Sequence, residues 1–598
     1  MHSLVRPNEW IVLRLPSDTL KVLQIIPNTI VSLGKYGTFS SNLILDRPYN
    51  LTYELLDRQE GQKDSELRIV PATELHADTI AEEDAAANPA SEDKVVIGGN
   101  GVAFELVGEN GEVIMRSNRE TIDDSARQTL TMEEIEELKR EGTGAGQDLI
   151  AKLMLSHTAL DQKTSFSLAK YKLLKTKKYS RRFTILPMDV PMMINWMLEA
   201  RDATKVFELR DESLALVGCW ANVHHAGQTN PEAEDDGGRW LVVDETGGLV
   251  VAAMAERMGI LYPKEIKTAP EPDQTEDEDE DEGTTIPTKR TSSWLSTSNT
   301  LTLIHSNAQP NLSLLKYFNF TIDNPSSLHP LTKSLHPISW LQLISPERDT
   351  TYSTPPPTYT TEEFQAMKAG RRGGYYRKKR RWTRTKNVVD ATRAGSFSGL
   401  VVASSMDPVS IVRHTISLLA GGAPIAIYSA TIEPLAILAD LYSTSRRAAF
   451  VQAPPPGFEE LSAKEKEQWV GNEDFPLNPT LILGATVQTS KARKWQVLPG
   501  RTHPEMTGRG GAEGYVFTGV KVLPAEGRVE ARGRYKRKKA ETNSKDAEGR
   551  PVNSNEKTES SGAATPIPVA KKIKLEANEN GSTGNTDQAA EETDSPAV

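Results

Sequence analysis

The sequence predicts a small all-β domain followed by a larger α/β domain whose sheet is doubly wound and mainly parallel. Two patterns support this fold class. Short apolar runs divided by turn residues fill residues 8–56, which is typical of a small β-barrel. From residue 183 onward, strand and helix patterns alternate, as they do where helices cover both faces of a parallel sheet.

The N-terminal barrel domain is expected to span residues 1–117. Residues 57–101 are acidic, rich in alanine and aperiodic, which indicates a disordered insertion. The strand pattern then resumes at Val102–Met115, where the pair Asn110-Gly111 is a strong signal for a hairpin turn. We therefore expect the barrel to be completed after the insertion.

Residues 118–182 predict helices that connect the two domains and end in a basic segment. Thr131 and Glu134 form a capping box ahead of Ile135, which marks the start of one helix. Another helix pattern begins near Ser167 and runs into the basic end.

The α/β domain is expected to span residues 183–523. Its strand patterns include Thr300–His305 and Gly399–Ala403. The polar, low-complexity residues 524–598 predict a disordered tail. Aperiodic stretches that we interpret as insertions lie at about 226–238, 263–298, 345–396 and 444–476.

Composition narrows the classes of function. The net charge of −11 argues against a nucleic-acid partner for the chain as a whole, but the acids concentrate in residues 57–93 and 271–282 and leave the remainder mildly basic. Cys219 is the single cysteine, which excludes an intrachain disulfide and favours a reducing compartment. The longest apolar stretch, 418–442, is interrupted by prolines and predicts no membrane span.

The stretch Trp240–Gly259 reads as a strand, a turn and a helix, where a doubly wound domain places its glycine-rich cofactor loop. Methyltransferases that use S-adenosylmethionine carry an acid-x-Gly-x-Gly-x-Gly motif there. With Glu245 as the acid, Gly247 matches the first glycine, but Leu249 and Val251 stand at the next two. We interpret the loop as degenerate and predict no cofactor on this chain. The alternatives are an active site with unusual residues and a chance likeness.

Two later strands lack the other acids that such a site uses. The strand that follows ends in His305-Ser306-Asn307, which offers no carboxylate for the ribose hydroxyls. Ser404 and Ser405 stand where a catalytic carboxylate would follow its strand, and Asp407 comes late. The sequence therefore predicts no catalytic residue, and His503 lacks nearby partners for a metal site.

Three long stretches match one family: NRETIDDSARQTLTMEEIEELKREG (118–142), KYKLLKTKKYSRRFTIL (170–186) and KWQVLPGRTHPEMTGRGGAEGYVFTG (494–519). With GKYGTF (34–39), they resemble the non-catalytic subunit of the eukaryotic tRNA (adenine(58)-N(1))-methyltransferase. The resemblance implies an N-terminal β-barrel and a Rossmann-like methyltransferase domain. It also implies a homologous catalytic partner that holds S-adenosylmethionine, a heterotetramer of two such pairs, tRNA as substrate and a location in the nucleus.

The first candidate RNA-binding cluster lies at the end of the connecting region. A helix there would place several of its bases along one face, opposite Leu173 and Leu174. Dense bases interleaved with tyrosines favour contact with tRNA, and a solvated helix end is the alternative. The cluster comprises Lys170, Lys172, Lys175, Lys177, Lys178, Arg181 and Arg182.

Two further basic segments are candidates. GGYYRKKRRWTRTK (373–386) combines bases with aromatic residues that could grip phosphates and stack on an unpaired base, although a flexible loop or a nuclear import signal is an alternative. The segment KWQVLPGRTHPEM (494–506) is interpreted as structural, shaping either the subunit interface or the RNA groove. The candidates in and beside these segments are Arg377, Lys378, Lys379, Arg493, Lys494 and Arg501.

The tail segment PVAKKIKLE (568–576) resembles a nuclear import signal, with added RNA affinity as the alternative. We therefore expect a nuclear, non-catalytic, tRNA-binding subunit. The competing hypotheses are an active S-adenosylmethionine-dependent RNA methyltransferase and a general RNA-binding protein associated with translation.

Overall fold

The computed structural model describes residues 4–56, 64–75, 106–107, 113–115, 130–131, 133–135, 147–156, 165–225, 237–262, 299–498, 501–504 and 514–524. All of them lie in the first of two compact units, Met1–Gly533. Within these described ranges, no helix is long and apolar enough to cross a membrane.

The N-terminal region contains an antiparallel sheet of five strands with the order β2-β1-β9-β5-β6. Ile11 and Leu13 of β1 and Phe183 and Ile185 of β9 point into one small apolar core, while Val12 belongs to the larger core of the α/β domain. The strands are β1 (Trp10–Arg14), β2 (Leu20–Gln24), β5 (Thr52–Leu55), β6 (Leu67–Ile69) and β9 (Arg182–Pro187), and β3 (Ile30–Ser32) pairs separately with β4 (Thr38–Ser40).

This sheet differs from the predicted barrel in two ways. The strand at Phe183, predicted to open the α/β domain, is β9 and lies between β1 and β5. The two strands of the predicted hairpin are present as β7 (Leu106–Val107) and β8 (Val113–Met115), but they form a sheet of their own, and the predicted turn at Asn110-Gly111 lies outside the described residues. Among the described residues β2 and β6 are open edges, so closure into a barrel stays a prediction.

The connecting region contains α4 (Gln147–Leu155) and α5 (Ser165–Tyr179). The predicted capping box is confirmed, because the Thr131 amide donates to the Glu134 carboxylate at 2.8 Å and the Glu134 amide donates to the Thr131 hydroxyl at 3.3 Å. Ile135 and two leucines of α4 form a small buried cluster against which Tyr179 packs. The short helix α1 (Ala72–Leu75) follows β6.

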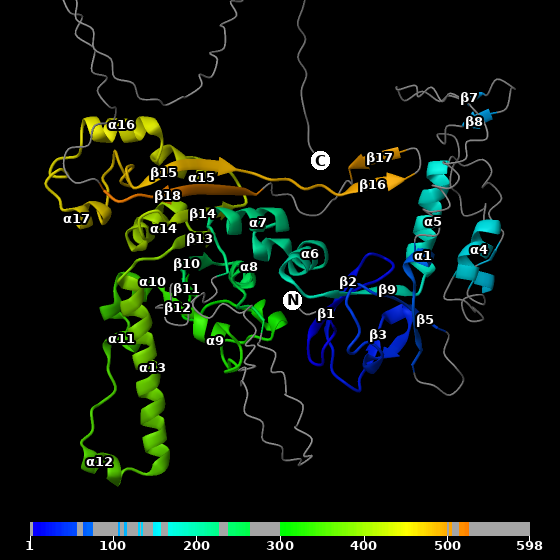
Figure 1. The fold of residues 1–598 in the computed structure, drawn as a ribbon, viewed down its shortest axis with the longest axis horizontal. Helices are drawn as coiled ribbons and strands as arrows, with labels where there is room; N and C mark the ends of the chain where they lie inside the picture. Colours follow the sequence, from blue (N-terminus) through cyan, green and yellow to red (C-terminus); the bar gives the residue numbers. More distant parts are fainter. Residues whose placement is uncertain are drawn as a thin grey trace, which may run out of the picture. The chain divides into compact units, whose positions relative to one another are not determined.

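The α/β domain is built on a seven-stranded sheet with the order β12-β11-β10-β13-β14-β18-β15 (Figure 1). The five strands from β12 to β14 run parallel, and β18 runs antiparallel to both of its neighbours. This is a Rossmann-like, doubly wound sheet in which β10 is the middle one of the five parallel strands. The strands are β10 (Arg239–Asp244), β11 (Thr300–His305), β12 (Leu335–Ser339), β13 (Gly399–Ala403), β14 (Pro424–Ser429), β15 (Ile482–Gln488) and β18 (Tyr515–Lys521).

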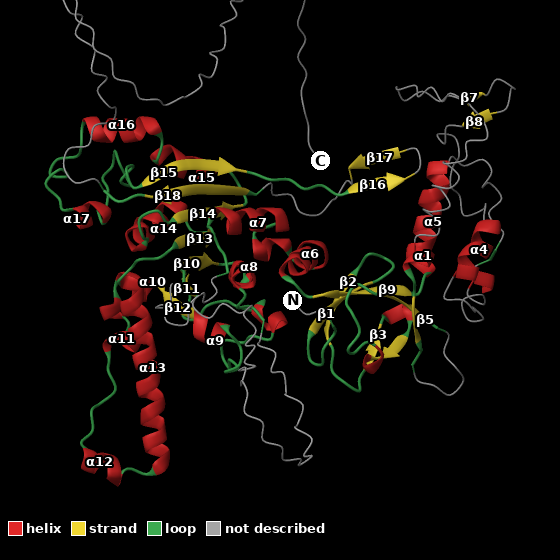
Figure 2. Ribbon diagram, viewed as in Figure 1, coloured by secondary structure: helices red, strands yellow, loops and turns green. Residues whose placement is uncertain are grey.

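Helices cover both faces of this sheet (Figure 2). Alternate residues of β10 point to opposite faces: Trp240 and Val242 enter one buried cluster, and Leu241 and Val243 enter the other. The first cluster contains residues of α6 (Val190–Ala200), α7 (Asp211–Trp220) and α8 (Leu249–Met258); the second contains residues of α10 (Trp340–Ile344), α14 (Pro408–Thr415) and α15 (Glu433–Leu441).

Two stretches predicted to be aperiodic insertions contain helices, so the aperiodic part of the prediction is wrong there, and their being insertions stays a prediction. Residues 345–396 form α11 (Thr350–Ser353), α12 (Thr361–Ala366) and α13 (Ala369–Arg393), and residues 444–476 contain α16 (Thr444–Gln452) and α17 (Ala463–Glu467). In α13 an apolar period is missing because burial is confined to its last part, at Val389 and Thr392. The edge strand β12 and the preceding α9 (Leu331–Ser334) were also missed.

Candidate functional site

The turn after β10 (residues 245–248, called the glycine turn) stands where a cofactor loop would lie. Asp244, the last residue of β10, is buried, and its carboxylate accepts hydrogen bonds from the amides of Thr246 at 2.7 Å and Val251 at 3.0 Å. Burial raises the pKa of Asp244, although these hydrogen bonds oppose the shift. The carboxylate therefore joins the strand end to the first turn of α8.

Leucine side chains of the same chain pack against the glycine turn. Gly247 and Gly248 both have positive φ, at 76° and 93°, as a tight strand-to-helix turn requires. A Cβ atom added to Gly248 would lie 3.1 Å from Cδ2 of Leu312 and 3.3 Å from Cγ of Leu315. The Leu314 amide also donates to the Gly247 carbonyl at 3.0 Å. We call Leu312, Leu314 and Leu315 the leucine cover; all three are buried.

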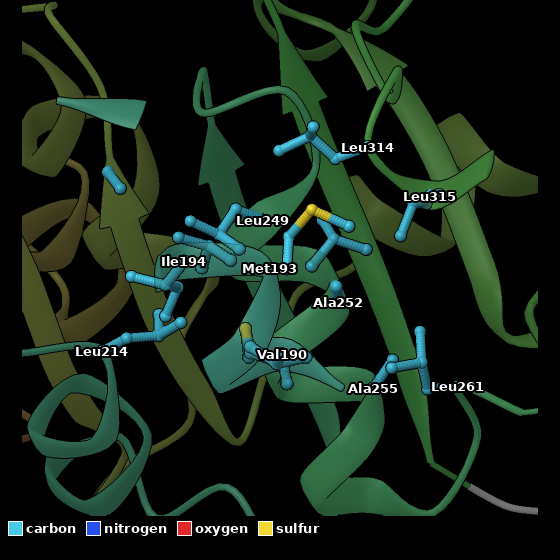
Figure 3. Close-up of a cluster of buried hydrophobic side chains, with 14 of the residues drawn as sticks. Val190, Met193, Ile194, Leu214, Leu249, Ala252, Ala255, Leu261, Leu314 and Leu315 are labelled. Carbon is cyan, nitrogen blue, oxygen red and sulfur yellow. The ribbon is translucent and has the colours of Figure 1, made fainter. Parts of the chain in front are cut away.

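The structure shows where Leu249 and Val251, which replace two glycines of the cofactor motif, place their side chains. Both residues lie in α8, are fully buried and belong to the core beneath the sheet face. Figure 3 shows Leu249 among the sticks of this core, with Leu314 and Leu315 in the same cluster. The residues that meet the glycine turn come instead from the segment after β11, which the sequence argument did not consider.

Glu245 connects the carboxyl ends of three neighbouring strands. Its carboxylate accepts hydrogen bonds from the Ser405 amide at 2.9 Å and the Ser404 hydroxyl at 2.9 Å, both after β13, and from the Ser306 hydroxyl at 3.3 Å, after β11. Burial opposes ionisation of Glu245, but the hydrogen bonds from these serines outweigh it and lower the pKa. The acid that matches the cofactor motif is thus satisfied by its own chain.

A cavity of about 390 Å³ lies beside these serines, between the ends of β13 and β14. Its lining includes Ser404, Ser405, Asp407 and Tyr428. Asp407 is the N-cap of α14, because its carboxylate accepts from the amides of Val409 at 3.2 Å and Ser410 at 3.1 Å. Within the described ranges, no group of three or more His, Cys, Asp or Glu side chains could hold a metal ion.

The bases of the first RNA-binding cluster separate into an exposed set and a structural set. Lys170, Lys172 and Lys178 are exposed on α5. Lys177 forms an ion pair with Asp18. Leu174, predicted to lie on the face opposite the bases, is 55% exposed.

The end of this cluster lies outside the helix. Arg181 follows α5 rather than continuing it, so it does not share the predicted helix face. Arg182 lies in β9, where its side chain is only 18% exposed and its guanidinium pairs with Glu54 at 2.9 Å and with Glu74. Arg68 pairs with the same two carboxylates. Arg182 is therefore part of a structural ion-pair network.

The second candidate segment is a helix and not the flexible loop considered as its alternative. Arg377, Lys378 and Lys379 are exposed on α13, on different sides of the helix. Only Lys379 among these three lines a cavity of about 700 Å³ beside β12. Arg380 and Arg384 line it too, and their spacing of four residues in the sequence is the signal that places them on one helix face.

The third candidate segment is tied to the α/β domain. Lys494 pairs with Glu199 of α6, and the Ala492 amide donates to Glu212 of α7 at 3.2 Å. Arg493 is exposed, and Arg501 begins β17 (Arg501–Pro504), which pairs with β16 (Trp495–Leu498). Trp495 and Val497 of β16 are 57% and 71% exposed, which suits the predicted structural role in an interface.

Comparisons with known proteins identify the family of this chain. The Gcd10p family model matches residues 4–368. The tRNA (adenine(58)-N(1))-methyltransferase non-catalytic subunit of Aspergillus fumigatus is 46% identical over 90% of this chain and 96% of its own length, and that of Aspergillus oryzae is 47% identical with the same coverage. The tRNA (m1A58) methyltransferase TrmI of Aquifex aeolicus aligns in structure with a TM-score of 0.33 and 9% identity, over 87% of this chain and all of that one. The chain belongs to the Gcd10p family, as a homologue of these non-catalytic subunits.

Proposed function

We propose that this chain is the non-catalytic subunit of the nuclear methyltransferase that forms N1-methyladenosine at position 58 of tRNA, and that it binds and positions tRNA for a catalytic partner. The observation that carries the proposal is the covered glycine turn, in a chain whose relatives are named as non-catalytic subunits of this enzyme. The remaining surface then serves RNA and the partner subunit.

The residues around the glycine turn do not fit S-adenosylmethionine. Backbone atoms of such a turn must approach the cofactor closely, and here the leucine cover contacts both glycines. The end of β11 offers Ser306 and Asn307 and no carboxylate, and Glu245 is already bonded to serines on both sides. We therefore propose that the cofactor site is degenerate and that the partner holds the methyl donor.

We assign four lysines of α5 to the tRNA surface, of which three are exposed and Lys175 is half-buried. Lys170, Lys172, Lys175 and Lys178 follow one another along the helix without a carboxylate between them. Holding a folded polyanion requires such cations, since most affinity for nucleic acid comes from phosphate contacts. Arg182 is left out because its guanidinium stabilises the N-terminal sheet.

The proposed assembly is a heterotetramer of two pairs, each with one catalytic subunit. The exposed apolar side chains of β16 support an interface at this hairpin, since water-exposed Trp495 and Val497 gain free energy when a partner covers them. Nuclear location rests on the import-like segment Pro568–Glu576, which lies outside the described residues.

Reconstitution with the homologous catalytic subunit tests this function. We expect the two chains to co-purify as a complex that methylates tRNA. We expect no methylation of tRNA by this chain alone, and none by a complex that lacks the tRNA contacts. Methyl transfer by this chain alone would support an independent enzyme. A stable monomer that binds RNA and ignores the partner would support a general RNA-binding protein instead.

A further inference from the structure

We propose that the groove between α13 and the edge strand β12 is a second tRNA contact, which binds consecutive phosphates and stacks one unpaired base on Tyr376. The inference rests on the proposed function and names a site that none of the relatives' names assigns. The groove has a volume of about 700 Å³, and its chemistry comes mainly from Lys333, His336, Tyr376, Lys379, Arg380 and Arg384.

The groove-lining residues of α13 recur at the spacing of one helix face. Tyr376, Arg380 and Arg384 follow at intervals of four residues, and Lys379 lies beside them. Lys333 of α9 is exposed on the opposite wall. The cations thus line two walls of one groove rather than being spread around a solvated helix.

Within the part of the chain that the structure describes, these cations have no carboxylate partner. Among the described residues, no ion pair involves Lys333, Lys379, Arg380 or Arg384. The whole of α13 carries ten lysines and arginines and a single acid, Asp390. Unpaired cations facing one groove repel one another and attract an anion with regularly spaced charges, which describes a nucleic-acid backbone.

His336 adds a polar group at the inner side of the groove. Its Nδ1 atom is buried and has no hydrogen-bond partner in the described structure, although such groups normally find one. Burial, with smaller contributions from Arg384 and Arg239, lowers the pKa of His336. The neutral imidazole has one donor and one acceptor nitrogen, which suits a ribose hydroxyl or a phosphate oxygen.

Contacts of α13 with residues that do not line the groove hold the helix in place, so the groove is preorganised. The Trp382 indole donates to the Tyr352 carbonyl at 2.9 Å, and the Tyr352 hydroxyl donates to Asp390 at 2.8 Å. Figure 1 shows α12 at the other end of α13, where Phe364 packs edge-on against Tyr376 at 5.3 Å between ring centroids. Tyr376 is still 49% exposed, which leaves ring surface for a base.

The test compares two triple variants within the full complex of this chain and its catalytic partner. The groove variant is Lys379→Ala, Arg380→Ala, Arg384→Ala. The control is Arg371→Ala, Lys378→Ala, Arg381→Ala, which removes the same one lysine and two arginines from exposed positions of α13 that do not line the groove. Binding of tRNA is measured by fluorescence anisotropy over a range of salt concentrations, after thermal melting has shown that both complexes are folded.

We expect the groove variant to raise the Kd for tRNA about tenfold or more and to reduce the slope of log K against log salt by about 2, since each lost phosphate contact removes about 0.7 to 0.9. We expect the control to change the Kd less than about threefold, as general loss of charge would. Equal effects of the two variants would overturn the groove. Failure of the wild-type complex to bind tRNA would instead overturn the proposed function, so the two failures are distinct.

A second pair of variants tests the stacked base. Tyr376→Leu removes the groove aromatic, and Tyr375→Leu removes a neighbour that packs in the same aromatic cluster but does not line the groove. We expect Tyr376→Leu alone to weaken tRNA binding, by about fivefold or more and without a change in salt slope. Equal affinities for the two variants would overturn base stacking at Tyr376.

Discussion

The glycine turn and the α13 groove lie in the same α/β domain, yet they differ in whether their polar groups have partners within the chain. At the glycine turn, Asp244 and Glu245 are fully engaged by amides and hydroxyls of the chain, and leucines cover the backbone. In the groove, Arg380 and Arg384 have no carboxylate partner in the described structure and a buried imidazole nitrogen lacks a hydrogen bond.

We infer from this difference that the polar residues at the glycine turn stabilise the fold, whereas those of the groove bind a ligand. Internally satisfied polar groups lower the free energy of the folded chain, whereas unsatisfied ones cost free energy unless a partner completes them. Substitutions at the glycine turn should therefore change stability and leave tRNA affinity intact. Substitutions of the exposed basic surfaces should do the reverse.

The largest effect on stability is expected at Asp244. Asp244→Ala leaves two buried amides without an acceptor and should lower the free energy of unfolding by about 3 kcal/mol. Asp407→Ala is the matched control, because it removes an exposed N-cap and should cost about 1 kcal/mol. Denaturant unfolding measures both, and equal losses would contradict the structural role of Asp244.

The contact of the leucine cover with the turn is tested by Gly248→Ala. Both Gly248 and Gly422 have positive φ, but an added Cβ meets Leu312 at Gly248 and meets nothing within 4 Å at Gly422. Gly422→Ala should cost about 1 kcal/mol for the left-handed backbone. Gly248→Ala should cost about 1 to 3 kcal/mol more, because the added Cβ overpacks the turn. If thermal melting gives the same loss for both, the turn is not covered.

Arg182 and Lys178 provide a contrast within one predicted RNA-binding cluster. Arg182→Ala should lower the free energy of unfolding by about 2 kcal/mol, because it weakens the pairing of the buried Glu54. Replacing Lys170, Lys172, Lys175 and Lys178 by alanine should leave stability almost unchanged and weaken tRNA binding several-fold. Unfolding curves and anisotropy titrations distinguish the two; a stable four-lysine variant with wild-type tRNA affinity would remove α5 from the RNA surface.

The smallest effect concerns Glu245 and pH. The pKa of Glu245 is below the ordinary value of 4.5 in the folded chain, so ionised Glu245 stabilises the fold above that pH. This contribution is lost as the pH falls through the lowered pKa. Glu245→Gln should therefore be less stable than wild type at neutral pH, and the gap should narrow in acid. A gap that is constant from neutral to acidic pH would show that the serines do not favour the carboxylate.

Sequence patterns predicted the elements whose burial is local and periodic. β11 at Thr300–His305 and β13 at Gly399–Ala403 have the predicted bounds, because continuous apolar runs mark strands that are buried on both faces. β12 was missed because it is a short edge strand that contains Pro337. The prediction that the strand at Phe183 opens the α/β domain was wrong. The partners with which a strand pairs depend on distant residues, and the strand's own segment does not reveal them.

The candidate site shows the same division. Leu249 and Val251 indicated from the sequence that the glycine motif is degenerate. The leucine cover could not be predicted in this way, because residues 312–315 are distant in sequence from residues 247–248, against which they pack. The α13 groove depends on which side of the helix faces β12. That choice is set by the packing of Trp382 and Val389, so the basic run alone could not separate Lys379 from Lys378.

The central claim is that this chain fills its own cofactor turn and leaves the methyl donor to a partner. Isothermal titration of the isolated full-length chain with S-adenosylmethionine tests it most directly, with the reconstituted complex as the positive control. We predict no saturable heat for the isolated chain and saturable binding by the complex. Stoichiometric binding of S-adenosylmethionine to the isolated chain, lost in Gly248→Ala, would contradict the account.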